Sequence, residues 1–192
     1  MTPCRRTRQP VFDLPAGLRL RRWSQDDAPM LLIAMRDPLI RHYSGFLVED
    51  RSPALARLQH YTDSWNHGEG AAWALCDAGD QLVGSVRFAL TDGDLGTGAV
   101  GYWLTAQVRG RGAATTAVGL GTTTVLRQLG WHRIELRHAV ENERSCRVAR
   151  RCGYRFEGVL RAGMRYPDDG RWSDEHLHAR LAGDEGPRDP GR

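Results

Sequence analysis

The stretch Val100-Gly-Tyr-Trp-Leu-Thr-Ala-Gln-Val-Arg-Gly-Arg-Gly112 joins an apolar run to a segment with helical periodicity. Residues 99–104 are nearly all apolar, which is typical of a central strand buried on both faces. Residues 113–129 carry apolar side chains along one stripe of a helix, at Ala114, Val118, Val125 and Leu129. Gly121 lies on that stripe, where a missing side chain would let the helix approach a sheet closely. The stretch therefore predicts a buried strand, a glycine-rich turn and a helix.

A glycine-rich turn between a strand and a helix is a candidate anion site. It places N–H groups that have no partner within the helix beside the positive end of the helix dipole, where a phosphate or pyrophosphate binds. Gly110 and Gly112 permit backbone conformations that other residues would block, and Arg109 and Arg111 add positive charge. Taken alone, the pattern fits an ordinary surface turn equally well.

The rest of the chain has a mixed α/β order. We expect helices at 25–36, 51–67, 113–129 and 142–151, with Pro38 stopping the first one. Strands are expected around Leu18–Arg21 and at 71–76, 81–90, 99–104, 132–138, 154–161 and 172–181. One folded domain should cover residues 14–182. Residues 1–13 are expected to form a flexible arm and residues 183–192 a disordered tail, because neither can bury much apolar surface.

Composition indicates a soluble protein. The 192 residues are 26% charged and 41% hydrophobic, and no run approaches the roughly 18 apolar residues of a membrane helix. No apolar region follows the first residues as in a secretory signal, so we expect a cytoplasmic protein with no membrane partner. All 27 basic residues are arginine, which excludes a P-loop and any lysine-based chemistry. The net charge of +4 favours anionic ligands, but its scattered distribution argues against specific nucleic-acid binding.

The cysteines and histidines give no metal signature. The four cysteines include no Cys-x-x-Cys pair and are interpreted as reduced, buried thiols. His176-Leu-His178 could place two imidazoles on one face of a strand, but no further ligands stand at metal spacing. The expectation is that no metal is bound.

A Rossmann-type nucleotide site is one alternative for the glycine turn. Gly110-Arg-Gly112 follows a strand, and Glu135 lies about 20 residues further on, where an acid could bind a ribose. Thr115 occupies the position of the third glycine, and little α/β sequence follows. Both details weaken this alternative without removing it.

Several blocks, in this order, resemble the GCN5-related N-acetyltransferase (GNAT) superfamily, in its ribosomal-protein N-terminal acetyltransferase (RimJ/RimL-like) branch. They are GLRLRRWSQDDA, VGYWLTAQVRGRGAATTA, ENERSCRVARRCGYRFEGVLR and DGRWSDEHLHARL, within residues 17–181. Gln107–Gly112 matches the coenzyme A signature Gln/Arg-x-x-Gly-x-Gly/Ala of that family. The resemblance implies an α/β (α+β) fold with a mixed, mostly antiparallel sheet of about seven strands, splayed at its middle and flanked by about four helices.

The resemblance also implies an activity and a donor site. The protein would move an acetyl group from acetyl-CoA, or from another acyl-CoA, to a primary amine through a tetrahedral intermediate. The acceptor could be a protein N-terminus, a ribosomal protein or a small molecule, and no metal is needed. The strand edge would hold the pantetheine arm, the turn and the helix start the pyrophosphate, and the backbone N–H of Leu104 would be the oxyanion donor. The expected coenzyme-binding residues are Trp103, Leu104, Val108, Arg109, Gly110, Arg111, Gly112, Ala113, Ala114, Asn142 and Ser145.

The catalytic residues follow the family pattern less closely. Many members use a tyrosine as general acid four residues before the Gly-Phe/Tyr step, and Ala149 stands there. In the RimJ/RimL-like branch Ser145 would take that role, and Asp174 or Glu175 is a candidate base. His42, Tyr43 and Trp65 are expected by analogy to shape the acceptor site. Because the family's tyrosine and glutamate are missing, a catalytically silent CoA-binding or partner-binding module remains an alternative function. A second copy of the chain, in a homodimer, is a further candidate partner.

Overall fold

The computed structural model, which describes residues 8–44 and 46–184, contains an eight-stranded sheet in the order β1-β2-β3-β4-β5-β6-β8-β7. All neighbouring strands are antiparallel except β5 and β6. The strands are β1 Phe12–Leu14, β2 Leu18–Arg22, β3 Gly70–Cys76, β4 Leu82–Asp92, β5 Thr97–Leu104, β6 Arg133–Ala139, β7 Arg155–Arg165 and β8 Trp172–Leu181. The predicted mixed, mostly antiparallel α/β fold is confirmed, with eight strands instead of about seven.

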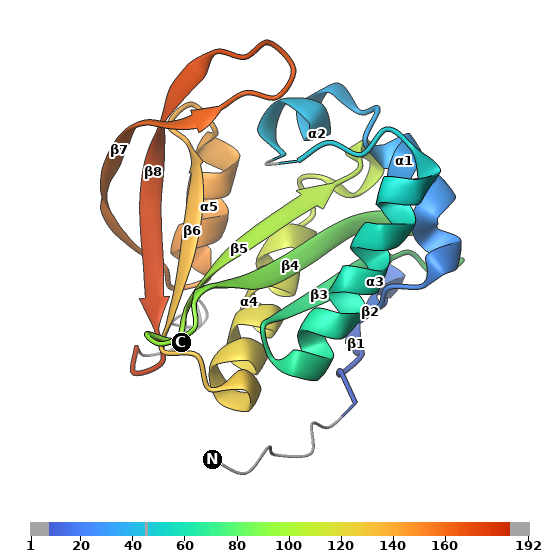
Figure 1. Cartoon of the computed structure of the whole chain (residues 1–192), viewed down its shortest axis with the longest axis horizontal. Coiled ribbons are helices and arrows are strands. Elements are labelled where there is room, and N and C mark those ends of the chain that lie inside the picture. Colours follow the sequence, from blue (N-terminus) through green and yellow to red (C-terminus); the bar gives the residue numbers. More distant parts are fainter. Residues whose placement is uncertain (1–7, 45, 185–192) are drawn as a thin grey trace.

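The sheet separates at its centre, between β5 and β6. These strands pair only over Thr97–Ala99 and Arg133–Glu135. Beyond that short parallel ladder, β5 runs away from β6 toward the upper right of Figure 1. Among the described residues, the second half of β5 therefore has a ladder partner on one side only, the side of β4.

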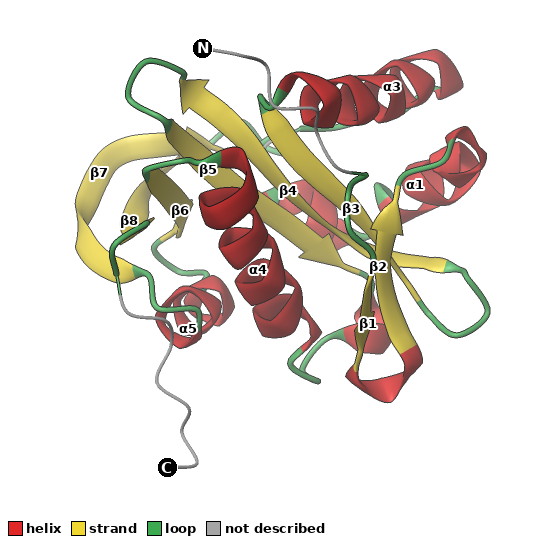
Figure 2. Ribbon diagram, turned by 90° about the horizontal axis from the view of Figure 1, so that it is seen from below, coloured by secondary structure: helices red, strands yellow, loops and turns green. Residues whose placement is uncertain are grey.

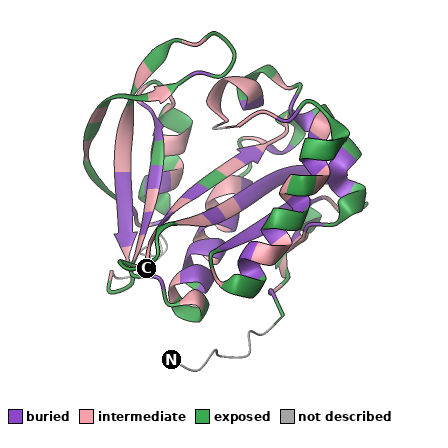
Figure 3. Ribbon diagram, in the orientation of Figure 1, coloured by how far each residue is buried: buried purple, intermediate pink, exposed green. Residues whose placement is uncertain are grey.

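Helices cover both faces of the sheet. The α-helices are α1 Ala28–Ala34, α2 Pro38–Tyr43, α3 Arg51–His67, α4 Ala113–Thr124 and α5 Glu143–Arg151. Figure 2 shows α1 and α3 on one side of the sheet and α4 and α5 on the other. β3 is buried along its whole length between these layers, as the purple ribbon in Figure 3 shows. None of the described helices is long and apolar enough to cross a membrane.

Residues near the N-terminus correct the expected domain boundary. β1, which the sequence does not predict, pairs with β2, and Gln9 Nε2 donates to the Ala72 carbonyl at 2.8 Å. The Pro10 carbonyl accepts from Trp73 Nε1 at 2.8 Å. Residues 9–13 are thus attached to the sheet rather than forming part of a flexible arm. Residues 1–7 of that arm and 185–192 of the expected tail lie outside the described residues.

The region around Pro38 also differs from the expectation. The first helix ends at Ala34, and Pro38 begins a second helix, α2, instead of only stopping the first. Asp37 is the N-cap of α2, where its carboxylate accepts from the backbone N–H groups of Leu39 and Ile40. Proline is well suited to the first helical position because that N–H has no partner within the helix.

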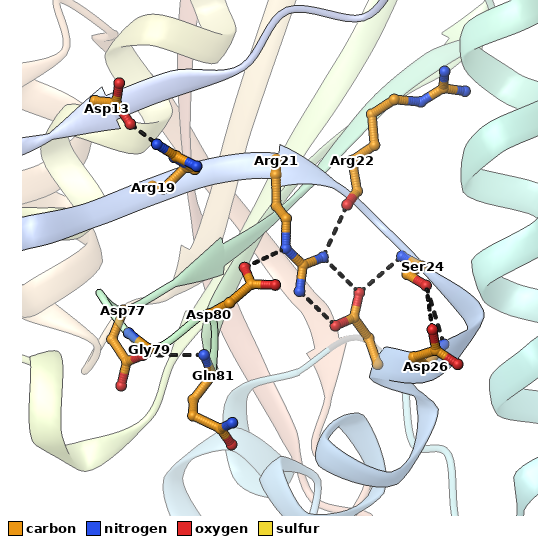
Figure 4. Close-up of polar contacts among 11 residues, drawn as sticks. Asp13, Arg19, Arg21, Arg22, Ser24, Asp26, Asp77, Gly79, Asp80 and Gln81 are labelled. Atoms are coloured by element: carbon orange, nitrogen blue, oxygen red, sulfur yellow. Dashed lines mark hydrogen bonds and ion pairs between the residues drawn. The ribbon is translucent and has the colours of Figure 1, made fainter.

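An ion-pair network attaches β2 to the start of α1 (Figure 4). Two nitrogens of Arg21 donate to the two carboxylate oxygens of Asp27, at 2.8 and 2.9 Å, and Nε donates to Asp80 at 2.7 Å. Asp27 also closes a capping box with Ser24. The hydrogen bond with Arg21 lowers the pKa of Asp80 below its usual value. The network joins β2, the β3–β4 turn and the first helical turn after β2.

α4 approaches the sheet closely at Gly121, as the sequence predicts. A Cβ added to Gly121 would overlap the ring of Phe88 on β4. Gly119, two residues earlier and on the opposite side of the helix, has no heavy atom of the described residues within 4 Å of such a Cβ beyond its own surroundings on the helix. The two glycines therefore differ in the space around them while sharing a helix.

Replacing Gly121 by alanine is expected to lower the free energy of unfolding by about 1–3 kcal/mol, because the added methyl group overpacks the contact with Phe88. The matched control, Gly119→Ala, should raise that free energy by about 0.5–1 kcal/mol through helix propensity alone. Urea denaturation of both variants measures the difference. Equal effects of the two substitutions would show that α4 does not depend on close packing at Gly121.

Candidate active site

A cleft of about 900 Å³ opens where β5 leaves β6. Its walls are the end of β5, the turn after it, the first turn of α4, one side of α5 along its whole length, and α2. Ten of the predicted site residues line it, nine from the expected coenzyme site and one from the expected acceptor site. They are Tyr43, Trp103, Leu104, Arg109, Gly110, Gly112, Ala113, Ala114, Asn142 and Ser145. The cleft thus collects residues that lie up to about a hundred positions apart in the sequence.

The backbone of Leu104 faces the open side of β5. The Thr105 N–H donates to the Val83 carbonyl at 2.8 Å, and Leu104 is the partner of Gly84 in the register. In an antiparallel ladder this pattern makes Leu104 and Gly84 a non-hydrogen-bonded pair, so the N–H and carbonyl of Leu104 point away from β4. By the same alternation the backbone groups of Tyr102 point away from β4, and those of Trp103 point toward it. The backbone groups on the open side of β5 are therefore those of Tyr102 and Leu104, and not those of Trp103 as the sequence predicts.

The glycine turn leads directly into the start of α4. Gly110 and Gly112 have φ values of 76° and 81°, in the left-handed region that favours glycine. Gly112 is the N-cap and offers no side-chain hydrogen bond to the first helical turn. The N–H groups of Ala113 and Ala114 precede those that can bond within the helix. This end of the cleft therefore offers N–H groups and the positive end of the α4 dipole to an anion.

Two residues expected at the pyrophosphate site lie elsewhere. Val108 is 6% exposed, and its N–H donates to the Thr105 carbonyl at 3.2 Å. The side chains of Val108 and Arg111 line a separate cavity of about 300 Å³ beside Leu14 and Leu18. The N–H of Arg109 is also used, in a bond to the Ala106 carbonyl. Because the short helical turn before the glycines already uses the N–H groups of Val108 and Arg109, these groups are not free to bind an anion as the sequence predicts.

The side chain of Arg109 is committed to protein contacts. Its Nη2 lies 2.8 Å from Oδ2 of Asp37, and its Nε donates to the Leu104 carbonyl at 2.9 Å. Burial would raise the pKa of Asp37, but hydrogen bonds from Arg109 and from the N–H groups of α2 outweigh burial and hold it below its usual value. Arg109 thus joins β5, the glycine turn and α2 around the cleft.

Ser145 lies in the cleft beside a tyrosine that sequence reasoning missed. The Tyr102 hydroxyl donates to Ser145 Oγ at 2.9 Å, and the Ser145 N–H donates to Oδ1 of Asn142 at 3.2 Å. Burial raises the pKa of Tyr102 to about 12, although the hydrogen bond with Ser145 acts in the opposite direction. Because Tyr102 donates this bond, the serine's own hydrogen is available to another acceptor. Asn142 is the N-cap of α5 and also lines the cleft.

An acidic residue of the cleft, Glu141, was also missed. Its Oε2 accepts from Ser173 Oγ at 3.1 Å, and it stands directly before the cap of α5. Burial, and then the charge of Glu141, raise the pKa of Tyr43 above its usual value. The pattern Glu-Asn-Glu-Arg-Ser at 141–145 was the available signal, but the sequence analysis assigned roles to Asn142 and Ser145 and none to Glu141.

The two predicted bases and two of the three predicted acceptor residues, His42 and Trp65, do not line the cleft. The Asp174 carboxylate accepts from the Ala162 N–H at 2.8 Å, where β7 departs from its regular register. Glu175 is half-buried against Gly163, and burial raises its pKa. Trp65 is 2% exposed in the core and packs against Trp73 at 6.3 Å between ring centroids. Packing of α3 on the sheet therefore takes Trp65 away from the site.

His42 contributes to the rim beside the cleft. Its ring stacks on Tyr166 at 4.0 Å between centroids, and its Nδ1 lies 2.9 Å from Oδ2 of Asp168. Tyr166 and Asp168 belong to the β7–β8 hairpin, which reaches toward α2 at the top of Figure 1. The contact brings the C-terminal hairpin and α2 together at one edge of the site.

The Rossmann alternative is wrong for this fold. A dinucleotide-binding sheet is mostly parallel, whereas only β5 and β6 are parallel here. Glu135, the proposed ribose ligand, forms ion pairs with Arg133 and Arg137 on its own strand. The glycine turn therefore belongs to a different kind of site.

Comparison with known proteins gives consistent matches. The model of a family described as acetyltransferase (GNAT) domain matches residues 17–155. The Bacillus subtilis protein named probable N-acetyltransferase YjcK is 34% identical over 107 residues, which are 55% of this chain and 58% of that protein. The match to this relative thus spans less than two thirds of its length.

Solved structures share the whole architecture. The ribosomal-protein-S5-alanine acetyltransferase of Vibrio fischeri superimposes with a TM-score of 0.82 at 20% identity, covering 92% of this chain and 98% of that one. Mycobacterium smegmatis RimJ, in complex with a CoA disulfide, gives a TM-score of 0.77 at 25% identity, covering 90% and 86%. At 20% identity, the similarity to the Vibrio fischeri protein shows a shared fold alone.

Proposed function

The chain belongs to the GNAT acetyltransferase domain family, and on this premise we propose that it transfers an acetyl group, or another acyl group, from acyl-CoA to a primary amine. The observation that carries the proposal is a single cleft that joins three features. These are the unpaired side of β5, the N-terminal turn of α4, and the hydrogen-bonded pair of Tyr102 and Ser145.

The cleft suits the extended shape and charge of the donor. Gly110, Gly112 and the first turn of α4 leave room for a pyrophosphate, since a Cβ at either glycine would meet no atom within 4 Å. The N–H groups of Ala113 and Ala114 would hold its oxygens. The outward-facing backbone groups of Tyr102 and Leu104 would pair with the amides of the pantetheine arm, as a neighbouring strand would. When bound, acetyl-CoA supplies the activated thioester.

The Leu104 N–H and Ser145 divide the charge stabilisation. The Leu104 N–H would donate to the carbonyl oxygen that becomes negative during transfer. As the bond from the amine nitrogen to the acetyl carbon forms and the carbon–sulfur bond breaks, the Ser145 hydroxyl would give its proton to the departing thiolate. Tyr102 would hold Ser145 in the orientation needed for this donation and stabilise the oxygen left behind.

Glu141 is the residue we propose as the base. An amine must lose a proton to attack the thioester, and a carboxylate in the cleft can accept it directly or through one water molecule. Glu141 lines the cleft close to Tyr43 and one residue before Asn142, whereas Asp174 and Glu175 do not line it. The ammonium form of the acceptor would also be attracted by this negative charge.

A peptide N-terminus is the acceptor class we propose first. Leu39, Ile40 and Tyr43 of α2 form an apolar and aromatic wall opposite α5, which suits the first side chains of a peptide whose amine reaches Glu141. The name of the Vibrio fischeri protein, ribosomal-protein-S5-alanine acetyltransferase, gives a protein as the acceptor of that enzyme and supports this choice. Three further points stay predictions. They are a ribosomal protein as the acceptor, a cytoplasmic location and a homodimer.

Release of free CoA thiol tests the activity directly. The full chain and acetyl-CoA are incubated with one class of amine in each reaction. The classes are short peptides bearing free N-termini, polyamines and aminoglycosides. We expect thiol release that requires a free amine, with the peptides as the best acceptors and N-terminally blocked peptides giving none. Stabilisation by acetyl-CoA without turnover on any amine would instead support the silent binding module.

A further inference from the structure

Three histidines and a cysteine outside the cleft lie close enough together to share one ion. They are His138 on β6, His176 and His178 on β8, and Cys146 on α5. One ligand atom from each lies within 4.8 Å of the others. None of the four lines the cleft, so the proposed acetyl transfer does not use them.

The strand register explains why these residues meet. His138 is paired directly with His176, and Leu136 with His178. Because side chains alternate along a strand, His176 and His178 share one face of β8, and His138 lies on the same face of β6. α5 covers that face, and Cys146 Sγ lies 3.8 Å from Nε2 of His178. The cluster is therefore closed on one side by the sheet and on the other by the helix.

The polar atoms of the cluster are buried and incompletely satisfied. His138 and His178 are 5% and 0% exposed, and Cys146 is 9% exposed. Nδ1 of His138 lies 2.8 Å from the Ala139 carbonyl, to which it can donate, while its Nε2 has no hydrogen-bond partner among the described residues. Nδ1 of His176 is likewise buried without such a partner in the described part of the chain. Buried nitrogen atoms of this kind destabilise a protein unless something binds them.

We propose that His138, Cys146, His176 and His178 bind a zinc ion. Three imidazole nitrogens and one thiolate form a donor set that Zn²⁺ prefers, in tetrahedral geometry. Zinc–nitrogen and zinc–sulfur bonds of about 2.0–2.1 and 2.3 Å place neighbouring ligand atoms about 3.3–3.6 Å apart. The 3.8 Å separation of Cys146 and His178 is close to that value, and small rotations of the side chains bring in the others.

The bond from His138 to the Ala139 carbonyl is the support that zinc-binding histidines usually have. A metal-binding imidazole generally donates its second ring N–H to a carbonyl or carboxylate, which fixes the ring and leaves the other nitrogen for the metal. His138 has this arrangement before any ion is considered. Four protein ligands leave no open position for water, so the zinc has a structural role.

The role we assign is to attach α5 to β6 and β8. Cys146 directly follows Ser145, and both lie within two turns of Asn142. A zinc ion at Cys146 would fix the helix from its buried side, while Ser145 and Asn142 face the cleft. The site would thus determine where the proposed acid stands without touching the substrates.

Zinc titration of the full chain, without a histidine tag and after treatment with a chelator, tests the site. We expect one tightly bound zinc per chain and a higher melting temperature with zinc. Cys146→Ala and His176→Ala should each weaken binding at least about 100-fold, since even residues that only support ligands are worth 10- to 100-fold. Cys152→Ala, a buried cysteine at the end of the same helix, is the control and should bind zinc normally.

Two measurements on the unmodified chain keep the test valid if a variant does not fold. Cobalt in place of zinc should show the visible absorption of a tetrahedral site and a thiolate charge-transfer band. Zinc should also protect Cys146 from alkylation in a peptide map and leave the rate at Cys152 unchanged. Absence of binding, a cobalt spectrum without the thiolate band, or equal protection of both cysteines would overturn the proposal. None of these results depends on acetyl transfer.

Discussion

Replacing Gly112 by glutamate is expected to abolish the stabilisation of this protein by acetyl-CoA. Gly112 is the N-cap of α4 and has φ of 81°, so any side chain there is strained and stands beside the first helical N–H groups. A carboxylate at this position would repel the pyrophosphate and compete for the same N–H groups. At a concentration about 100 times Kd, a ligand stabilises the native state by about 2.7 kcal/mol, or roughly 5–10 °C in a chain of this size.

The matched control is Gly130→Glu. Gly130 follows the same helical segment at its other end, has φ of 71°, and has no atom within 4 Å of an added Cβ. The control therefore carries the same charge and comparable backbone strain, far from the cleft. Differential scanning fluorimetry with and without acetyl-CoA measures both variants. If acetyl-CoA raises the melting temperature of Gly112→Glu as much as that of the unmodified protein, acetyl-CoA binds elsewhere. If neither variant shows the rise, the substitutions act on folding and not on binding.

Removing the Ser145 hydroxyl is expected to give the second large effect. Ser145→Ala should lower kcat by about 100-fold or more, the usual contribution of a positioned general acid. KM for acetyl-CoA should change little, because the outward-facing strand edge and the α4 turn remain. Tyr102→Phe keeps the serine but removes the hydrogen bond that orients it. It should therefore lower kcat less than Ser145→Ala does, and the double variant should be no worse than Ser145→Ala alone.

The pH dependence separates the roles of Tyr102 and Ser145. Because burial raises the pKa of Tyr102 to about 12, its hydroxyl stays protonated and continues to donate up to about pH 10. Ionisation of Tyr102 should therefore produce no fall in rate between pH 7 and 10. Tyr154→Phe is the control, since its hydroxyl is also buried and forms a hydrogen bond with Thr122 outside the cleft. Unchanged kcat in Ser145→Ala would contradict the proposed acid.

Much of the fold follows from local patterns. The predicted helix at 51–67 and the strand at 172–181 agree with α3 and β8 residue for residue, because each is a long segment with a clear stop signal. Pro38 illustrates the limit of such signals: the same residue can stop one helix and begin another, and Asp37 as a cap decides between them. β1 was missed because three residues are too few for any periodicity.

The sequence by itself indicated the family and the glycine turn, since Gln107–Gly112 is contiguous and the conformation of its glycines depends on their own backbone. Tertiary structure decided which side chains stand around that turn. Tyr102 and Ser145, which are 43 positions apart in the sequence, form a hydrogen bond. Trp65 is buried in the core and does not line the cleft. His138 and Cys146 join the histidines of β8 only through strand register and helix packing. Periodicity reports the neighbours of a residue along one element, whereas contacts between elements depend on how the whole chain buries its apolar surface.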